Sequence, residues 1–273
     1  MKESFFEPRG LYYRTNEFAA GRPTLVFIHG LSGSSSAWLK YEDYFSKKYN
    51  LLSFDLRGHG KSRKPKQYAD YEMKNFADDL DALLRYLDIK QCILVSHSFA
   101  TLIALDFLAM FPNDVEAAVF LSPSYSVSKR LIARLLKPFF HLGRLLGVFP
   151  FSGRIGKHID YTKYKNTGDW NIRRMIADVG NTTLRVYLYC TLQSYTVDRE
   201  DFLGDIKIPV LLMQGKKDTV FPVENSIFMA DKIKDSELIL VDHADHIVVL
   251  NNFDEVSKSI GNFVDKRAQF AHA

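Results

Sequence analysis

The sequence predicts an α/β fold in which helices flank a mostly parallel, doubly wound sheet. Short apolar runs of four or five residues end in glycine or polar turns, as strands buried on both faces do. Segments with helical periodicity separate these runs, and such alternation requires parallel crossovers. The alternation stops after Leu121 and resumes at Ile208. We therefore expect a core formed by residues 1–121 and 205–273, interrupted by an inserted helical subdomain at 122–204.

Each element of the core follows from its own pattern. Between residues 73 and 87, Phe76, Leu80 and Leu83 recur at the spacing of one helix face, and charged residues occupy the other face. A weaker pattern at 10–18 suggests an antiparallel edge strand. The expected strands are 24–28, 51–54, 92–95, 117–121, 210–213 and 238–241. The expected helices are 35–48, 73–87, 99–111, 223–233 and 253–266.

The insertion is too long to be a structureless loop. We expect an amphipathic helical piece at 128–146 and a loop-rich, tyrosine-rich part at 160–198. The insertion holds 13 lysines and arginines against 6 aspartates and glutamates. Contact of this basic stretch with a lipid surface is one reading, but a solvated face is the simpler one for a cap that hides its apolar side against the core.

The composition is that of a globular protein and excludes several classes. The chain has 273 residues, of which 47% are hydrophobic and 25% charged. A net charge of +4 without a basic stripe argues against nucleic-acid binding. No apolar run is long enough for stable membrane insertion. Cys92 and Cys190 form neither a disulfide framework nor a metal pair, which suits a reducing compartment, and we expect a cytoplasmic protein, a monomer or a small homo-oligomer.

A serine stands where an expected strand passes into an expected helix. The pentapeptide SHSFA at 96–100 carries Ser98 at its centre. In a nucleophile elbow the residues two before and two after the serine must be small, and Ser96 and Ala100 meet this need without being glycines. The helix N-terminus favours negative charge developing beside Ser98. A plain helix N-cap is the alternative role for this serine.

A glycine-rich turn, HGLSG at 29–33, follows the first expected parallel strand. Glycine lets a backbone N–H approach a reacting carbonyl group closely. The backbone amides of Leu31 and Phe99 are therefore candidates for an oxyanion hole. A tight structural turn is the other explanation of these glycines.

Asp218 and His246 each follow an expected strand at its carboxyl end, the edge where ligands bind in open α/β sheets. A histidine at this edge could reach both Asp218 and Ser98. His243 competes with His246, because spacing alone does not separate them. Asp242 and Asp245 compete with Asp218, but they share the loop of the histidine, which makes an orienting hydrogen bond awkward.

Together these motifs resemble the α/β-hydrolase family, and the resemblance covers nearly all of the chain outside the insertion. The motifs are His29-Gly30 with Gly33, DLRGHGKS at 55–62, the elbow around Ser98, GKKD at 215–218, and His246. The resemblance implies Ser98 as nucleophile, His246 as general base and acid, and Asp218 as the residue that orients the imidazole. It also implies that residues 122–204 close over the elbow. His97 and His29 are expected to line or order the site.

A serine activated by histidine and aspartate predicts covalent acyl transfer. We expect a serine hydrolase that cleaves carboxylic esters with small or medium apolar acyl groups, without a cofactor and without a metal. Two alternatives stay open. One is a carbon–carbon bond hydrolase of vinylogous diketones, and the other is a non-catalytic ligand receptor on the same fold.

Overall fold

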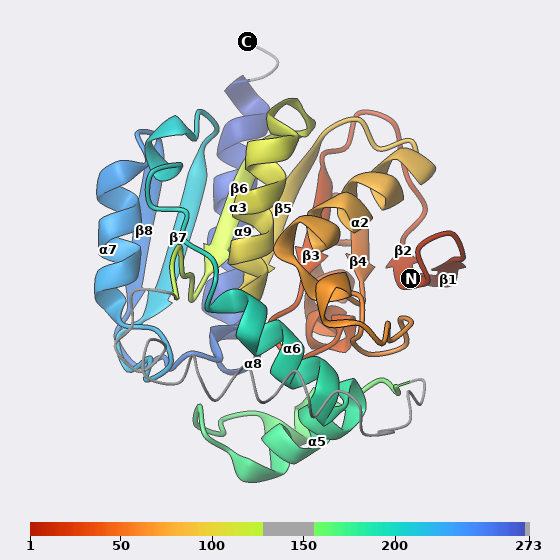
Figure 1. Cartoon of the computed structure of the whole chain (residues 1–273). Coiled ribbons are helices and arrows are strands. Elements are labelled where there is room, and N and C mark those ends of the chain that lie inside the picture. The colour runs from red at the N-terminus through yellow and green to blue at the C-terminus, as the bar shows by residue number, and fades with distance from the viewer. Residues whose placement is uncertain (128–155, 271–273) are drawn as a thin grey trace.

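The computed structural model describes residues 1–127 and 156–270 and is built on one mixed sheet (Figure 1). The sheet has eight strands in the order β1-β2-β4-β3-β5-β6-β7-β8. Strands β3 to β8 run parallel, whereas β1 and β2 pair antiparallel at one edge. The strands are β1 Lys2–Phe6, β2 Leu11–Thr15, β3 Thr24–Ile28, β4 Asn50–Phe54, β5 Cys92–His97, β6 Val115–Leu121, β7 Val210–Gly215 and β8 Ser236–Val241. This arrangement confirms the predicted fold class.

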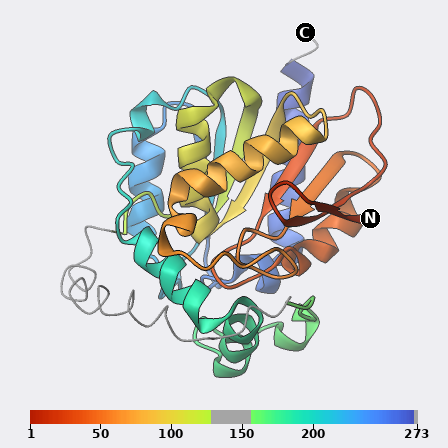
Figure 2. The ribbon, with the colours of Figure 1, turned by 45° about the vertical axis from the view of Figure 1, so that its right-hand side comes forward.

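Helices cover both faces of the sheet because alternate strand residues are apolar on both sides. Val26 and Ile28 face one apolar cluster with α2, α3 and α7, while Leu25 and Phe27 face a second cluster with α1 and α9. Figure 2 shows α2 and α3 side by side on the same face. In the described part of the chain the helices are α1 Leu39–Phe45, α2 Met73–Tyr86, α3 Phe99–Met110, α5 Ile172–Thr182, α6 Leu184–Ser194, α7 Val223–Lys232, α8 Val248–Asn251 and α9 Phe253–Phe270.

The antiparallel edge of the sheet has one strand more than the sequence pattern predicted. The expected edge strand at 10–18 is present as β2, but β1 lies outside it and has no counterpart in the sequence analysis. Its first residues are exposed, so β1 lacks the continuous apolar run used to recognise the other strands. The expected helix at 35–48 begins as a short helical turn, Ser35–Trp38, and continues as α1.

Helices α5 and α6, which follow β6 along the described residues, lie against the carboxyl ends of the parallel strands (Figure 1). The expectation of a loop-rich stretch at 160–198 is wrong, because α5 and α6 occupy much of it. Both helices begin at side-chain caps: Asn171 accepts a hydrogen bond from Arg174 N, and Thr183 accepts one from Val186 N. The helical piece expected at 128–146 lies outside the described residues. Among the described residues, no helix is both long and apolar enough to cross a bilayer.

A buried ion pair joins the antiparallel edge to α1. The Arg14 guanidinium lies 2.5 Å from a Glu42 carboxylate oxygen, and the two side chains are 2% and 1% exposed. Arg14 also donates to the hydroxyl and carbonyl oxygens of Ser35. Removing one partner of such a pair leaves an uncompensated charge in the interior.

We therefore expect Glu42→Ala to lower the free energy of unfolding by roughly 3–5 kcal/mol, measured by urea denaturation. The matched control is Glu237→Ala, which removes the exposed ion pair with Lys266 and is expected to cost less than about 1 kcal/mol. Equal losses in the two variants would contradict this account of the buried pair.

Candidate active site

Ser98 occupies a sharp turn between β5 and α3. Its backbone has φ 57° and ψ −120°, a strained conformation for a non-glycine residue. The flanking Ser96 and Ala100 are fully buried, so the turn has no room for larger side chains at these positions. The Ser98 side chain makes no N-cap hydrogen bond to α3, which argues against the alternative role of a plain helix cap. Its hydroxyl group is directed to another partner.

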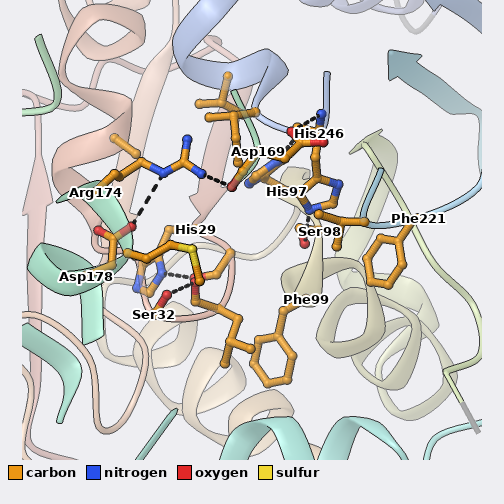
Figure 3. Close-up of a pocket in the computed structure, with 18 of the residues that line it drawn as sticks. His29, Ser32, His97, Ser98, Phe99, Asp169, Arg174, Asp178, Phe221 and His246 are labelled. Atoms are coloured by element: carbon orange, nitrogen blue, oxygen red, sulfur yellow. Dashed lines mark hydrogen bonds and ion pairs between the residues drawn. The ribbon is translucent and has the colours of Figure 1, made fainter. Parts of the chain in front are cut away.

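That partner is His246, which follows β8 and precedes α8. His246 Nε2 lies 2.7 Å from Ser98 Oγ, and His246 Nδ1 lies 2.8 Å from Asp218 Oδ2 (Figure 3 shows the serine and the histidine). A carboxylate only accepts hydrogen bonds, so Nδ1 carries the ring proton and Nε2 is left to accept the Ser98 hydroxyl hydrogen. The three side chains thus form one hydrogen-bonded line, which we call the relay.

Asp218 is held by donors on both carboxylate oxygens. Oδ1 accepts the backbone N–H groups of Val220 and Phe221, each at 2.8 Å. Oδ2 accepts from Gln214 Nε2 at 2.5 Å in addition to His246 Nδ1. The Asp218 side chain is fully buried. Four donors around one carboxylate leave it little freedom to turn.

The loops that carry Asp218 and His246 approach each other at Gly215, the last residue of β7. A Cβ atom at this position would lie 2.3 Å from the carbonyl oxygen of Ala244 and 2.4 Å from that of Asp245. Both neighbours are backbone atoms, so they could not move aside without moving the histidine loop. Glycine at 215 is therefore what allows the two loops to lie close enough for the hydrogen bond between Asp218 and His246.

The structure separates the competing residues from the relay. The side chain of His243 is exposed to solvent. Asp242 is also exposed and forms an ion pair with Lys216 at 2.6 Å. Asp245 accepts hydrogen bonds from Ile247 N and from Asn251 Nδ2. None of these three residues has a hydrogen bond to Ser98 or His246.

Two further histidines support the backbone around the site. His97 Nε2 donates to the carbonyl oxygen of His246 at 2.9 Å, and burial lowers the pKa of His97 to about 3, so its ring is neutral. His29 Nδ1 lies 2.8 Å from the Gly30 carbonyl oxygen, and His29 Nε2 lies 3.0 Å from Leu56 N. Burial also lowers the pKa of His29. A neutral His29 with its proton on Nδ1 satisfies both contacts.

The glycine-rich turn packs directly against the elbow. A Cβ atom on Gly30 would lie 3.0 Å from His97 Nδ1 and 3.4 Å from Ser98 Cβ. Leu31 follows Gly30, and its N–H has no acceptor among the described residues. Phe99 is the first residue of α3, where helix amides have no intrahelical partner. Both residues line the same cavity as Ser98.

That cavity has a volume of about 470 Å³ and lies between the carboxyl ends of the strands and the insertion. Ser98, His246 and the turn at 29–33 line this cavity, and α5 and α6 also contribute side chains to its lining. Figure 3 shows several of these side chains, including Arg174 and Asp178 of α5. Its apolar lining from the insertion and the loops comprises Tyr161, Trp170, Met175, Val179, Tyr187, Tyr195, Val220, Phe221, Ile247 and Leu250. The described residues contain no group of histidine, cysteine and carboxylate side chains placed to hold a metal ion.

Comparison with protein families assigns the fold independently of the site. The model of the alpha/beta hydrolase fold matches residues 23–253, which is most of the chain. The chain belongs to this family. The match begins just before β3 and ends at the start of α9, so it contains the relay, the glycine-rich turn and the insertion.

Relatives within the family carry different activities in their names. The proline iminopeptidase PfmaB of Pestalotiopsis fici is 28% identical over 263 residues, covering 89% of this chain and 92% of its own. Est816, described as an N-acyl homoserine lactone degrading enzyme, has a TM-score of 0.74 at 23% identity and covers 93% and 96% of the two chains. The esterase RhEst1 from Rhodococcus sp. has a TM-score of 0.71 at 20% identity, covering 97% and 98%. The two solved structures share the fold, and the family indicates a hydrolase.

Sequence reasoning missed three buried polar residues that the insertion contributes to the cavity: Asp169, Arg174 and Asp178. Asp178 Oδ1 accepts the Tyr161 hydroxyl hydrogen at 2.8 Å, and burial raises the pKa of the Asp178 carboxyl to about 6. Arg174 and Asp178 are one helical turn apart, a spacing visible in the sequence once α5 is recognised. Asp169 precedes the helix and has no such local signal.

Proposed function

We propose that this chain is a serine hydrolase that cleaves carboxylic esters of small or medium apolar acyl groups through an acyl-enzyme on Ser98. The observation that carries the proposal is the unbroken line of hydrogen bonds from Asp218 through His246 to Ser98. A serine hydroxyl is a poor nucleophile until a base takes its proton, and a neutral imidazole with Nε2 toward the hydroxyl is that base.

In the proposed reaction, Ser98 Oγ attacks the ester carbonyl carbon while its proton passes to His246 Nε2. Asp218 stabilises the imidazolium that forms. The amides of Leu31 and Phe99 stabilise the oxyanion, and the positive end of α3 points to the same place. His246 then protonates the leaving alcohol, and the acyl group stays on Ser98. Water activated by His246 attacks this acyl-enzyme and restores the serine.

The cavity supports the proposed substrate class. Its volume of about 470 Å³ is within the range of small-molecule sites, and apolar and aromatic side chains dominate its lining. We propose residues 122–204 as a cap that forms one side of this cavity. Its lining from α5 and α6 would then determine acyl length, while the residues of the relay perform the chemistry.

A fluorophosphonate probe provides the direct test. We expect stoichiometric labelling at Ser98, identified by peptide mass spectrometry, and no labelling of Ser98→Ala. The similar proteins are named as a peptidase and as an enzyme that degrades lactones. A substrate panel should therefore compare p-nitrophenyl esters of graded acyl length with a thioester, a prolyl amide and a vinylogous diketone. Preference for the amide or the diketone would overturn the ester assignment. Absence of labelling would favour a non-catalytic receptor.

A further inference from the structure

Asp169, in the segment that leads into α5, contacts both loops of the relay. Its Oδ1 accepts the backbone N–H of His246 at 2.7 Å. Its Oδ2 accepts the backbone N–H and the hydroxyl group of Thr219, at 2.9 and 2.7 Å. Thr219 is the residue next to Asp218. One carboxylate of the insertion therefore bridges the backbone beside the orienting aspartate and the backbone of the histidine.

Asp169 is itself held in place from α5. The Arg174 guanidinium donates from Nη2 to the backbone carbonyl oxygen of Asp169 at 2.5 Å (Figure 3). Asp169 is buried, with only 9% of its surface exposed. The next residue, Trp170, donates from its indole N–H to Thr219 Oγ1 at 2.9 Å. At the other end of α5, Thr182 donates its hydroxyl hydrogen to the Ser32 carbonyl oxygen in the glycine-rich turn.

These bonds matter because they are charge-assisted, and the one from His246 N is buried. A carboxylate that accepts backbone N–H groups makes stronger hydrogen bonds than a neutral acceptor does. Loss of the carboxylate leaves the buried backbone N–H of His246 without a partner and removes the two partly buried bonds from Thr219. The imidazole must stay within hydrogen-bond reach of Ser98 and Asp218 at once, and displacements of about 1 Å at a reacting centre reduce rates by about 100-fold.

We propose that Asp169 is a positioning residue for the relay. The geometry of His246 and Asp218 then depends on how the segment around Asp169 packs against their two loops. The inference rests on the proposed function for its kinetic consequence. It adds that the insertion takes part in catalysis through the backbone of the catalytic loops, and not only by lining the cavity.

The test compares Asp169→Ala and Asp169→Asn with Asn171→Ala in the full chain. Asn171 is the matched control, because it caps α5 two residues away and its side chain accepts from Arg174 N without touching either catalytic loop. For Asp169→Ala we expect kcat for an activated ester and the rate of fluorophosphonate labelling to fall together by roughly 10- to 100-fold, with little change in KM. Asp169→Asn retains one acceptor and is expected to lose less.

A spectroscopic measurement makes the result independent of turnover. The NMR resonances of the His246 imidazole, assigned with His246→Ala, are expected to shift or broaden in Asp169→Ala and to stay unchanged in Asn171→Ala. Unchanged resonances in Asp169→Ala would overturn the inference, as would equal kinetic losses in Asp169→Ala and Asn171→Ala, which indicate a merely structural effect. If the wild type neither hydrolyses esters nor binds the probe, the proposed function fails, and the resonances alone decide whether Asp169 positions the relay.

Discussion

Replacing Ser98 or His246 by alanine is expected to lower kcat/KM for an activated ester by roughly three to six orders of magnitude. Ser98→Ala removes the atom on which we propose the acyl-enzyme forms. His246→Ala leaves the serine hydroxyl without a base 2.7 Å away. Because the two groups act as one unit, we expect the double variant to be no slower than the slower single variant. Steady-state kinetics with p-nitrophenyl acetate measures all three, and circular dichroism verifies that each variant is folded.

His243→Ala is the matched control for the histidine. It removes a histidine of the same loop whose side chain is exposed and has no hydrogen bond to the relay. We expect its activity to stay within about twofold of the wild type. A large loss in His243→Ala together with near wild-type activity in His246→Ala would transfer the role of base to His243.

The second large effect is expected for Asp218→Asn, with a fall in kcat of roughly 10⁴-fold. The reason lies in the four donors that converge on the carboxylate. Whichever way the amide is turned, its NH₂ group faces two N–H donors. One orientation leaves the backbone donors of Val220 and Phe221 unsatisfied, and the other opposes His246 Nδ1–H and favours the wrong imidazole tautomer. Rapid kinetics at pH 7 to 9 would measure the loss.

Asp242→Asn is the control for this substitution. Asp242 is exposed, and its ion pair with Lys216 lies on the surface, where such pairs contribute about 1 kcal/mol or less. We expect unchanged kcat and a nearly unchanged melting temperature. If Asp218→Asn were equally mild, His246 would not depend on a carboxylate for its orientation, and the proposed role of Asp218 would be wrong.

The sequence predicted the sheet well because each central strand is an apolar run buried on both faces, a pattern that is local. It failed at β1, whose first residues are exposed, and at α6, where tyrosines and polar residues masked the helical spacing. It also missed α5, although that segment has no tyrosine and its apolar residues do follow helical spacing. In α6 the apolar residues are spread around the helix, because one side packs on the core and another lines the cavity. The spacing of apolar residues in α6 therefore does not indicate a single buried face.

For the site, motifs at strand ends named Ser98, Asp218 and His246, and the structure brings these three side chains together. The choice between His246 and His243 depended on tertiary structure, because the path of the loop after β8 exposes one ring and buries the other. The role of Asp169 could not be predicted from the sequence for a different reason. Its contacts to His246 join residues 77 positions apart, and no local pattern records them.

The succession of core strands from β2 to β8 along the chain, and the placement of a serine, an aspartate and a histidine at one edge of the sheet, were predicted from the amino-acid sequence alone. Both depend on short-range spacing of apolar and small residues. Tertiary structure alone decided which histidine faces the serine, how Asp169 and α5 pack against the loops of Asp218 and His246, and which side chains line the cavity. These features arise from packing and hydrogen bonds between distant segments, whose geometry exists only once the chain has folded.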